Sequence, residues 1–172
     1  MLKILDTLIS ILLLRKSPQD LPNGMFWLLV FIFANYALNL YQLAIIKSLK
    51  TSSDMVVSGN FAASLDIILQ VVLVVIVLQL AKRSARINQT LTALFGTGFL
   101  FALMVSPILQ LSLSSDGKSG GGLLLALMAW SFAVKGNIYK HALSITMMAG
   151  VGLAVGLFFA AYFIALAFTT TQ

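Results

Sequence analysis

The sequence SPQDLPNGMFW (residues 17–27) separates two strongly apolar stretches, LKILDTLISILLL (residues 2–14) before it and LLVFIFANYALNLYQLAII (residues 28–46) after it. The whole chain of 172 residues has the same character, because 60% of its residues are hydrophobic and only 9% are charged. A soluble fold of this length cannot remove so much apolar surface from water, so we expect lipid to surround most of the chain. The quoted stretch therefore joins two helices at a membrane surface.

The polar residues of this stretch predict an elbow over residues 17–24. Pro22 disfavours helical backbone at Leu21, so the preceding segment has to end there. Asn23 is a good N-cap for a helix that follows, and Trp27 is an aromatic residue of the kind found at membrane–water boundaries. We expect the elbow to turn the chain from a helix in the membrane plane into one that crosses the membrane.

Residues 1–16 are expected to form a short amphipathic helix that lies in the membrane interface. Their apolar side chains recur at helical spacing, and the polar ones share one stripe. The run is too short to cross about 30 Å of hydrocarbon, and Arg15 and Lys16 at its end can reach lipid headgroups. A secretory signal peptide is the alternative, although cations follow the run where a small-residue cleavage site would be needed.

Residues 25–172 are expected to form a single transmembrane domain, an all-α, polytopic helical bundle of about five membrane-spanning helices. The fourth predicted span is strongly apolar only as far as Val134. A four-helix bundle in which this segment is re-entrant is therefore the structural alternative. The predicted spans cover residues 25–46, 61–81, 89–111, 122–140 and 143–168.

The distribution of basic residues predicts which end of the bundle faces the cytoplasm. With five spans and the N-terminus inside, eight of the 11 Lys and Arg residues fall on the inner side and three on the outer side. The positive-inside rule favours this orientation, with a cytoplasmic N-terminus and an external C-terminus. We expect the inner cations to contact anionic lipid headgroups. The inner cations are Lys3, Arg15, Lys16, Lys82, Arg83, Arg86, Lys135 and Lys140, and the outer ones are Lys47, Lys50 and Lys118.

The inventory of reactive side chains is small. The chain has no cysteine, no glutamate and a single histidine, His141, whereas acid–base and metal sites draw mainly on these residue types. We expect His141 at the inner surface and Asp66 towards the outer one, too far apart for a catalytic triad. We therefore predict no catalytic residue, no metal and no cofactor. The net charge of +6 reflects the membrane topology, and we expect no nucleic-acid partner.

A cluster of polar side chains is predicted inside the membrane. Asp66 is the only acid within a predicted span, where an ionisable side chain is costly and often functional. Gln70 lies one turn further along the same helix face. The cluster has two interpretations, which are hydrogen bonds that join helices and a ligand or ion site that opens to the outer face. Its other members, in the outer halves of the first and third spans, are Asn39, Gln42, Ser106 and Gln110.

The last predicted span carries a small-residue face. Gly152 and Gly156 form a GxxxG pattern, which lets helix backbones approach closely. We expect this face to pack within the chain, and an interface with a second copy is the alternative.

The elbow also resembles a family motif. In DLPNGMFW (residues 20–27), an acidic-Leu pair is followed by Gly24 and an aromatic pair, directly before the first of five predicted helices. The Yip family (Ypt-interacting proteins, multi-pass proteins of the early secretory pathway with bacterial relatives) has a short acidic-Leu motif with Gly, Pro, Phe and Trp at this place. Pro22 precedes Gly24 here, whereas the family places its Pro after the Gly. The resemblance implies the architecture of a small five-helix membrane protein.

These observations favour a non-enzymatic integral membrane protein that acts as a scaffold, an adaptor or an accessory subunit of a membrane complex. A small oligomeric transporter or channel with a polar site around Asp66 is one alternative, and a lipid-handling protein is another. RKSPQDLP (residues 15–22) is similar to the opening of small proteobacterial membrane proteins, which implies a bacterial inner membrane. The expected partners are the lipid bilayer and either a membrane protein or a second copy of the chain.

Overall fold

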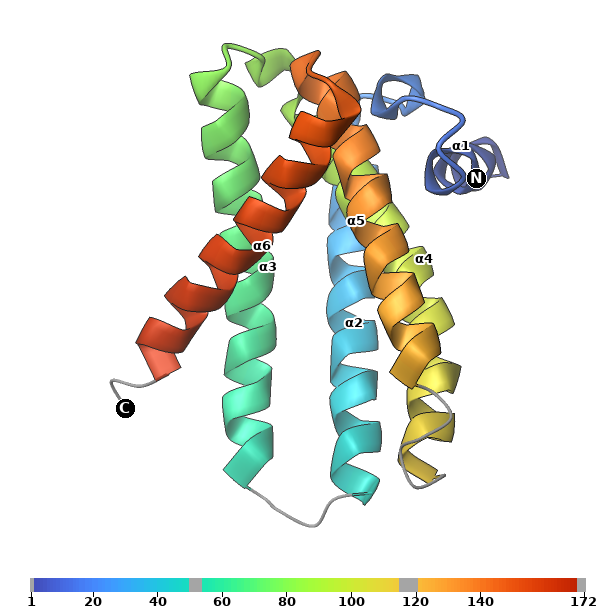
Figure 1. Ribbon diagram of the computed structural model, residues 1–172, viewed down its shortest axis with the longest axis vertical. Helices are drawn as coiled ribbons and strands as arrows, with labels where there is room; N and C mark the ends of the chain where they lie inside the picture. Colours follow the sequence, from blue (N-terminus) through green and yellow to red (C-terminus); the bar gives the residue numbers. More distant parts are fainter. Residues whose placement is uncertain (1, 50–53, 115–120, 170–172) are drawn as a thin grey trace.

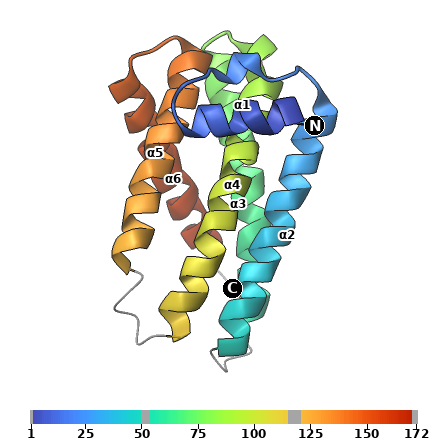
Figure 2. The same cartoon turned by 90° about the vertical axis from the view of Figure 1, so that its right-hand side faces the viewer.

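The computed structural model describes residues 2–49, 54–114 and 121–169, and all the regular elements in these ranges are helical. The all-α prediction is therefore confirmed for the described parts of the chain. The helices α2 to α6 run along the bundle, and α1 lies across it near one end (Figures 1 and 2). The elements are α1 (Leu2–Leu12), η1 (Pro18–Asp20), α2 (Met25–Leu49), α3 (Asp54–Leu80), η2 (Ser84–Arg86), α4 (Ile87–Ser114), α5 (Gly121–Leu143) and α6 (Met147–Thr169).

Several of these helices have the dimensions of membrane spans. Within the described residues, four segments are long and apolar enough to cross a membrane, and Ser64–Leu80 in α3 is a shorter apolar helix. Many of their large apolar side chains are exposed, as expected for helices that face lipid instead of water. The chain therefore has the character of an integral membrane protein. The four segments are Met25–Ile45, Ser84–Gln110, Gly121–Leu143 and Met147–Ala167.

The fourth predicted span is a continuous helix and does not turn back. α5 continues to Leu143, well beyond the apolar run that ends at Val134. Its second half is polar in sequence but is largely buried, with Ile138 and Ala142 almost inaccessible. α4 and α6 pack against it, so protein and not lipid surrounds this part of the helix. This packing explains why a polar sequence continues the helix.

Helices α5 and α6 cross at a pair of glycines, Gly136 and Gly150. A Cβ atom on Gly150 would overlap the carbonyl of Gly136, and one on Gly136 would lie 2.8 Å from the backbone nitrogen of Val151. Only glycine allows backbones to approach this closely. From this crossing the two helices diverge towards the opposite end of the bundle (Figure 1).

The small-residue face predicted at Gly152 and Gly156 does not make this contact. Both glycines are exposed, and a Cβ atom added to either would meet nothing within 4 Å. The expectation that this face packs within the chain is therefore wrong. The divergence of α6 from α5 carries the face away from the neighbouring helix.

The elbow contains a short hydrogen-bonded motif. The Ser17 N–H donates to the Asp20 carboxylate at 3.1 Å, and the Gln19 N–H donates to the Ser17 hydroxyl at 3.2 Å. This reciprocal pattern is a capping box, which satisfies backbone donors at the start of a helical turn. Pro18 and Leu21 are buried, so the elbow is packed against the bundle.

Side chains from α4 and η2 bind the elbow to the end of α5. The Gln89 amide donates to the carbonyls of Leu21 at 3.1 Å and of Gln19 at 3.4 Å. The Gln19 amide donates to the His141 carbonyl at 3.2 Å, and the Arg86 guanidinium donates to the same carbonyl at 2.9 Å. A cation at this position also suits the negative end of the helix dipole of α5. One hydrogen-bonded network therefore holds three separate parts of the chain together.

Helix α1 is anchored to the bundle by its own apolar side chains. Leu8 and Ile11 are fully buried, and α1 packs on α4 and α5. Leu8 occupies the space above Gly96, where a Cβ atom would lie 2.6 Å from it. An ion pair between Lys16 and Asp6 at 3.0 Å joins the segment after α1 back to the exposed side of this helix.

Gly150→Ala is expected to destabilise the bundle, because its methyl group would overlap the Gly136 carbonyl and push α5 and α6 apart. Overpacking of this kind costs about 1–3 kcal/mol, and thermal unfolding in detergent would show a lower midpoint. Gly152→Ala is the matched control, since it adds the same group to the same helix in open space. Equal midpoints for the two variants would contradict the close crossing.

Gln89→Ala is expected to loosen the elbow, since it removes two hydrogen bonds to elbow carbonyls. A loss of about 1–2 kcal/mol would raise the population of the detached elbow roughly five- to thirtyfold. The measurement is the rate of trypsin cleavage after Arg15 or Lys16, which are both exposed. Gln79→Ala, which changes an exposed glutamine on α3, is the control. Cleavage at the same rate in both variants would show that the elbow is held by other contacts.

Candidate functional site

The structure divides the six polar residues that were predicted to form one cluster. Asp66 and Gln70 lie on α3, and the other four lie where α2 packs against α4. α3 begins at Asp54, so Asp66 lies near the middle of its helix and not close to the outer end as predicted. The two groups therefore have to be considered separately.

The group between α2 and α4 is a ladder of hydrogen bonds between the two helices. The Gln42 amide donates to the Ser106 hydroxyl and to the Ala102 carbonyl, each at 3.2 Å. The Gln110 amide donates to the Tyr41 hydroxyl at 3.2 Å. Neutral polar side chains commonly join transmembrane helices in this way. These residues fit the structural interpretation of the predicted cluster.

Asn35 extends the same set of hydrogen bonds, although the sequence analysis did not include it in the polar cluster. Its amide donates to the carbonyls of Phe31 at 2.8 Å and of Phe95 at 2.6 Å, and only 9% of the residue is exposed. Asn39 donates to the Asn35 carbonyl at 3.0 Å. The spacing of four residues between the two asparagines is the signal that could have predicted this continuous polar edge of α2.

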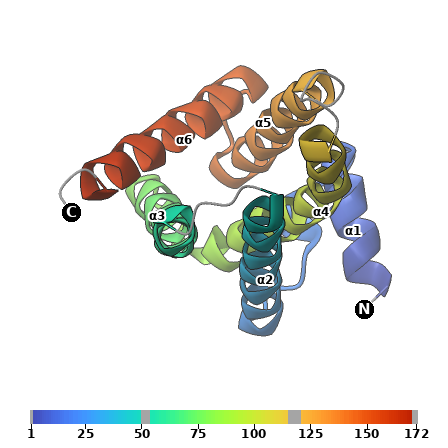
Figure 3. The same ribbon diagram turned by 90° about the horizontal axis from the view of Figure 1, so that it is seen from below.

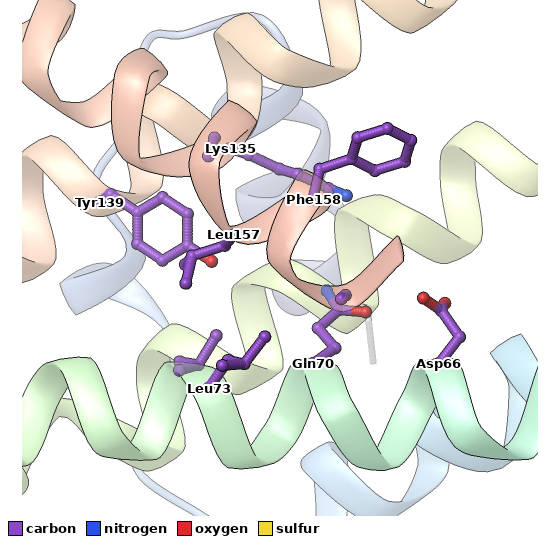
Figure 4. A pocket seen from close by; sticks show the side chains of 10 residues that line it. Asp66, Gln70, Leu73, Lys135, Tyr139, Leu157 and Phe158 are labelled. Carbon is purple, nitrogen blue, oxygen red and sulfur yellow. The ribbon is translucent and has the colours of Figure 1, made fainter. Parts of the chain in front are cut away.

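Asp66 and Gln70 line a pocket of about 140 Å³ together with Lys135 and Tyr139 (Figure 4). The pocket lies between α3, α5 and α6, and Figure 3 shows how these three helices are arranged when the structure is seen from below. It is next to the point where α5 and α6 cross, because Lys135 directly precedes Gly136. The remaining lining residues are apolar: Leu73, Val74, Ala154, Leu157, Phe158 and Ala161.

The pocket contains one acidic and one basic side chain. Asp66 comes from one wall and Lys135 from the opposite wall (Figure 4), and their charges attract each other. No ion pair within 4.0 Å joins these two described residues, however. Asp66 is exposed and Lys135 is half-buried, whereas Tyr139 is 3% exposed. The arrangement leaves two opposite charges facing a shared space with apolar sides.

Lys135 is the residue that the sequence interpretation placed differently. It was counted among the inner cations, but α5 continues about two turns beyond it, to Leu143. Its side chain therefore faces the pocket, in the interior of the bundle. Lys135 and Tyr139 are four residues apart, as are Asp66 and Gln70, and this paired spacing places each pair on one helix face.

A second hollow lies between α2 and α3. It has a volume of about 430 Å³, and its lining is almost entirely aliphatic and aromatic, which suits an acyl chain. The lining residues are Leu29, Ile32, Phe33, Tyr36, Ser64, Ile67 and Ile68.

No group of three or more His, Cys, Asp or Glu residues that could hold a metal ion occurs within the described parts of the chain. The polar groups that line the pocket are a carboxylate, an amine, an amide and a phenol.

Comparison of the chain with family models, with curated proteins and with solved structures found no match.

Asn35→Leu is expected to destabilise the fold, whereas Asp66→Asn is expected to leave its stability nearly unchanged. Asn35→Leu removes two buried hydrogen bonds, one within α2 and one from α2 to α4, and should destabilise the bundle by about 1–2 kcal/mol. Asp66→Asn should leave the unfolding midpoint nearly unchanged, because the carboxylate faces the pocket. Thermal unfolding of both variants in the same detergent is the measurement. If the Asn35→Leu variant were folded and the Asp66→Asn variant unfolded, the result would show that Asp66 is needed for the fold.

Proposed function

We propose that the chain is an integral membrane protein, not an enzyme, that binds a small polar solute in the Asp66–Lys135 pocket and moves it across the bilayer. One observation carries this proposal. Two opposite charges, an exposed Asp66 and a half-buried Lys135, face the same pocket between apolar helices, and no ion pair within 4.0 Å joins these described residues. Side chains that served only packing would be expected to be in direct contact.

The cost of the charges supports a functional interpretation. A charged side chain at the centre of a transmembrane helix costs about 2.5–3.5 kcal/mol on the insertion scale. The bundle already joins α2 to α4 with neutral amides and hydroxyls, so charge is not needed to hold helices together. Two charges kept at this cost are best explained by a polar ligand.

The proposed setting is a bacterial inner membrane that α2 to α6 cross as five spans. The end of the bundle that carries α1, η2 and the turn between α5 and α6 would face the cytoplasm, with the C-terminus outside. Exposed Leu5 and Ile9 on α1 and Leu13 directly after it would enter the acyl region, and nearby cations would contact anionic headgroups. The resemblance to the Yip family is, under this proposal, one of architecture.

The open face of α6 supports a second function, that of a scaffold or accessory subunit. Gly152 and Gly156 are exposed and unpacked within the chain, and small residues of this kind favour close contact with another transmembrane helix. A second copy or a membrane-protein partner would cover this face. The two functions are compatible, because the face and the pocket are lined by different residues.

Cysteine labelling tests whether the pocket is open to water. The chain has no cysteine, so each variant carries a single thiol. Ala161→Cys and Gln70→Cys should react with a charged, membrane-impermeant methanethiosulfonate reagent, because both positions line the pocket. Ile76→Cys, on an exposed part of α3 outside the pocket, should not react, since lipid would surround it. Equal lack of reaction at all three positions would contradict a transport pocket.

Three further thiols in the same labelling assay report the orientation. Ser84→Cys and Ser144→Cys should react in inside-out vesicles, and Gly122→Cys should react in intact cells, because these exposed positions lie at opposite ends of the bundle. The reverse pattern would contradict a cytoplasmic N-terminus.

A further inference from the structure

We infer that the solute bound in the pocket is a small zwitterion, whose ammonium group lies against Asp66 and whose anionic group lies against Lys135. This inference rests on the proposed function and specifies its ligand class. It follows from the charge balance of the pocket, its other polar groups and its size.

The charge balance excludes a simple ion as the preferred ligand. The lining residues carry one negative charge and one positive charge, so the pocket is neutral as a whole. In a medium of low dielectric, a lone cation or anion would leave one uncompensated charge, which is strongly unfavourable. A zwitterion keeps the occupied pocket neutral and also supplies each wall charge with an opposite charge.

The separation of the two wall charges supports the same ligand class. Asp66 and Lys135 extend from opposite walls (Figure 4), and they attract each other without forming an ion pair within 4.0 Å among the described residues. A molecule placed between them can bind both at once. The amide of Gln70 and the hydroxyl of Tyr139 add groups that both donate and accept hydrogen bonds.

The size and the apolar walls of the pocket limit the ligand. A volume of about 140 Å³ corresponds to roughly four or five water molecules at about 30 Å³ each. Leu73, Leu157 and Phe158 line the space beside the charged residues and would contact a short hydrocarbon segment between two charged ends. A free amino acid and the headgroup of a zwitterionic lipid share this chemistry, so the experiment has to distinguish the two sources.

The test uses the purified full chain and a series of ω-amino acids of increasing length as probes: glycine, β-alanine, 4-aminobutyrate and 5-aminopentanoate. Thermal unfolding in detergent is followed by tryptophan fluorescence, since ligands that bind the folded state raise its midpoint. We expect at least one member of the series to raise the midpoint by several degrees in a saturable way. The alkylamine and the carboxylate of matching length should not. Phosphoethanolamine and dispersed phosphatidylethanolamine form the lipid arm.

Variants assign any shift to the pocket. Asp66→Asn and Lys135→Gln should each abolish the shift produced by the active zwitterion, because each removes one of its two counter-charges. Lys140→Gln is the matched control, since it removes the same charge from the same helix outside the pocket. It should keep the full shift. Each variant's unfolding transition without ligand shows that it is folded.

The outcomes separate this inference from the proposed function. A shift from phosphatidylethanolamine alone supports a zwitterion and identifies the lipid headgroup as its source. An equal shift from the amine or the carboxylate alone overturns the zwitterion but leaves a solute pocket. No shift from any zwitterion also overturns the inference, and the proposed function then depends on the cysteine labelling. Unreactive thiols at Ala161 and Gln70 would remove that function as well.

Discussion

The contact between Gly136 on α5 and Gly150 on α6 is the constraint on which the pocket depends. Because neither residue has a side chain, the two backbones approach closely at one end of the bundle. The helices then diverge (Figure 1), and side chains of α3, α5 and α6 line the pocket between them. Lys135 precedes the crossing residue directly, so the contact also determines which way this side chain faces. A bulkier residue at either glycine would change the packing and the pocket together.

The bundle uses its polar side chains in two distinct ways. Between α2 and α4, amides and hydroxyls form short hydrogen bonds to each other and to backbone carbonyls, as Asn35 does with the Phe95 carbonyl at 2.6 Å. Between α3, α5 and α6, one acid and one amine face a space that no direct ion pair closes among the described residues. Neutral groups are sufficient for packing in lipid because each can satisfy the other locally. Placing a charged side chain within the membrane costs more free energy than placing a neutral one there. The separation of Asp66 and Lys135 is therefore better explained by a ligand between them than by a contribution to stability.

The elbow shows which structural features could be predicted from local sequence signals. Pro22 and the polar residues around it predicted a turn between two helices, and the structure contains a turn of this kind with a capping box at Ser17. The capping box is a local pattern of two side chains and their own backbone, so it depends on sequence spacing alone. The hydrogen bonds from Gln89 and Arg86 join residues far apart in the chain, and no local pattern could predict them.

Composition and the lengths of the apolar runs were sufficient to predict an all-helical membrane protein and the approximate place of each helix, because lipid requires every backbone group to be paired within its own helix. They were also sufficient to identify Asp66 as a costly residue. Which residue faces Asp66 across the pocket was a matter of tertiary structure. The hydropathy of residues 135–140 indicated a helix end, but α4 and α6 bury this segment and let α5 continue, which moves Lys135 into the interior. The packing of α5 against α6 also determined which glycines make the close contact. These are Gly136 and Gly150, and not Gly152 and Gly156. Which faces meet depends on the packing of all the helices at once, and the period of a single helix does not contain that information.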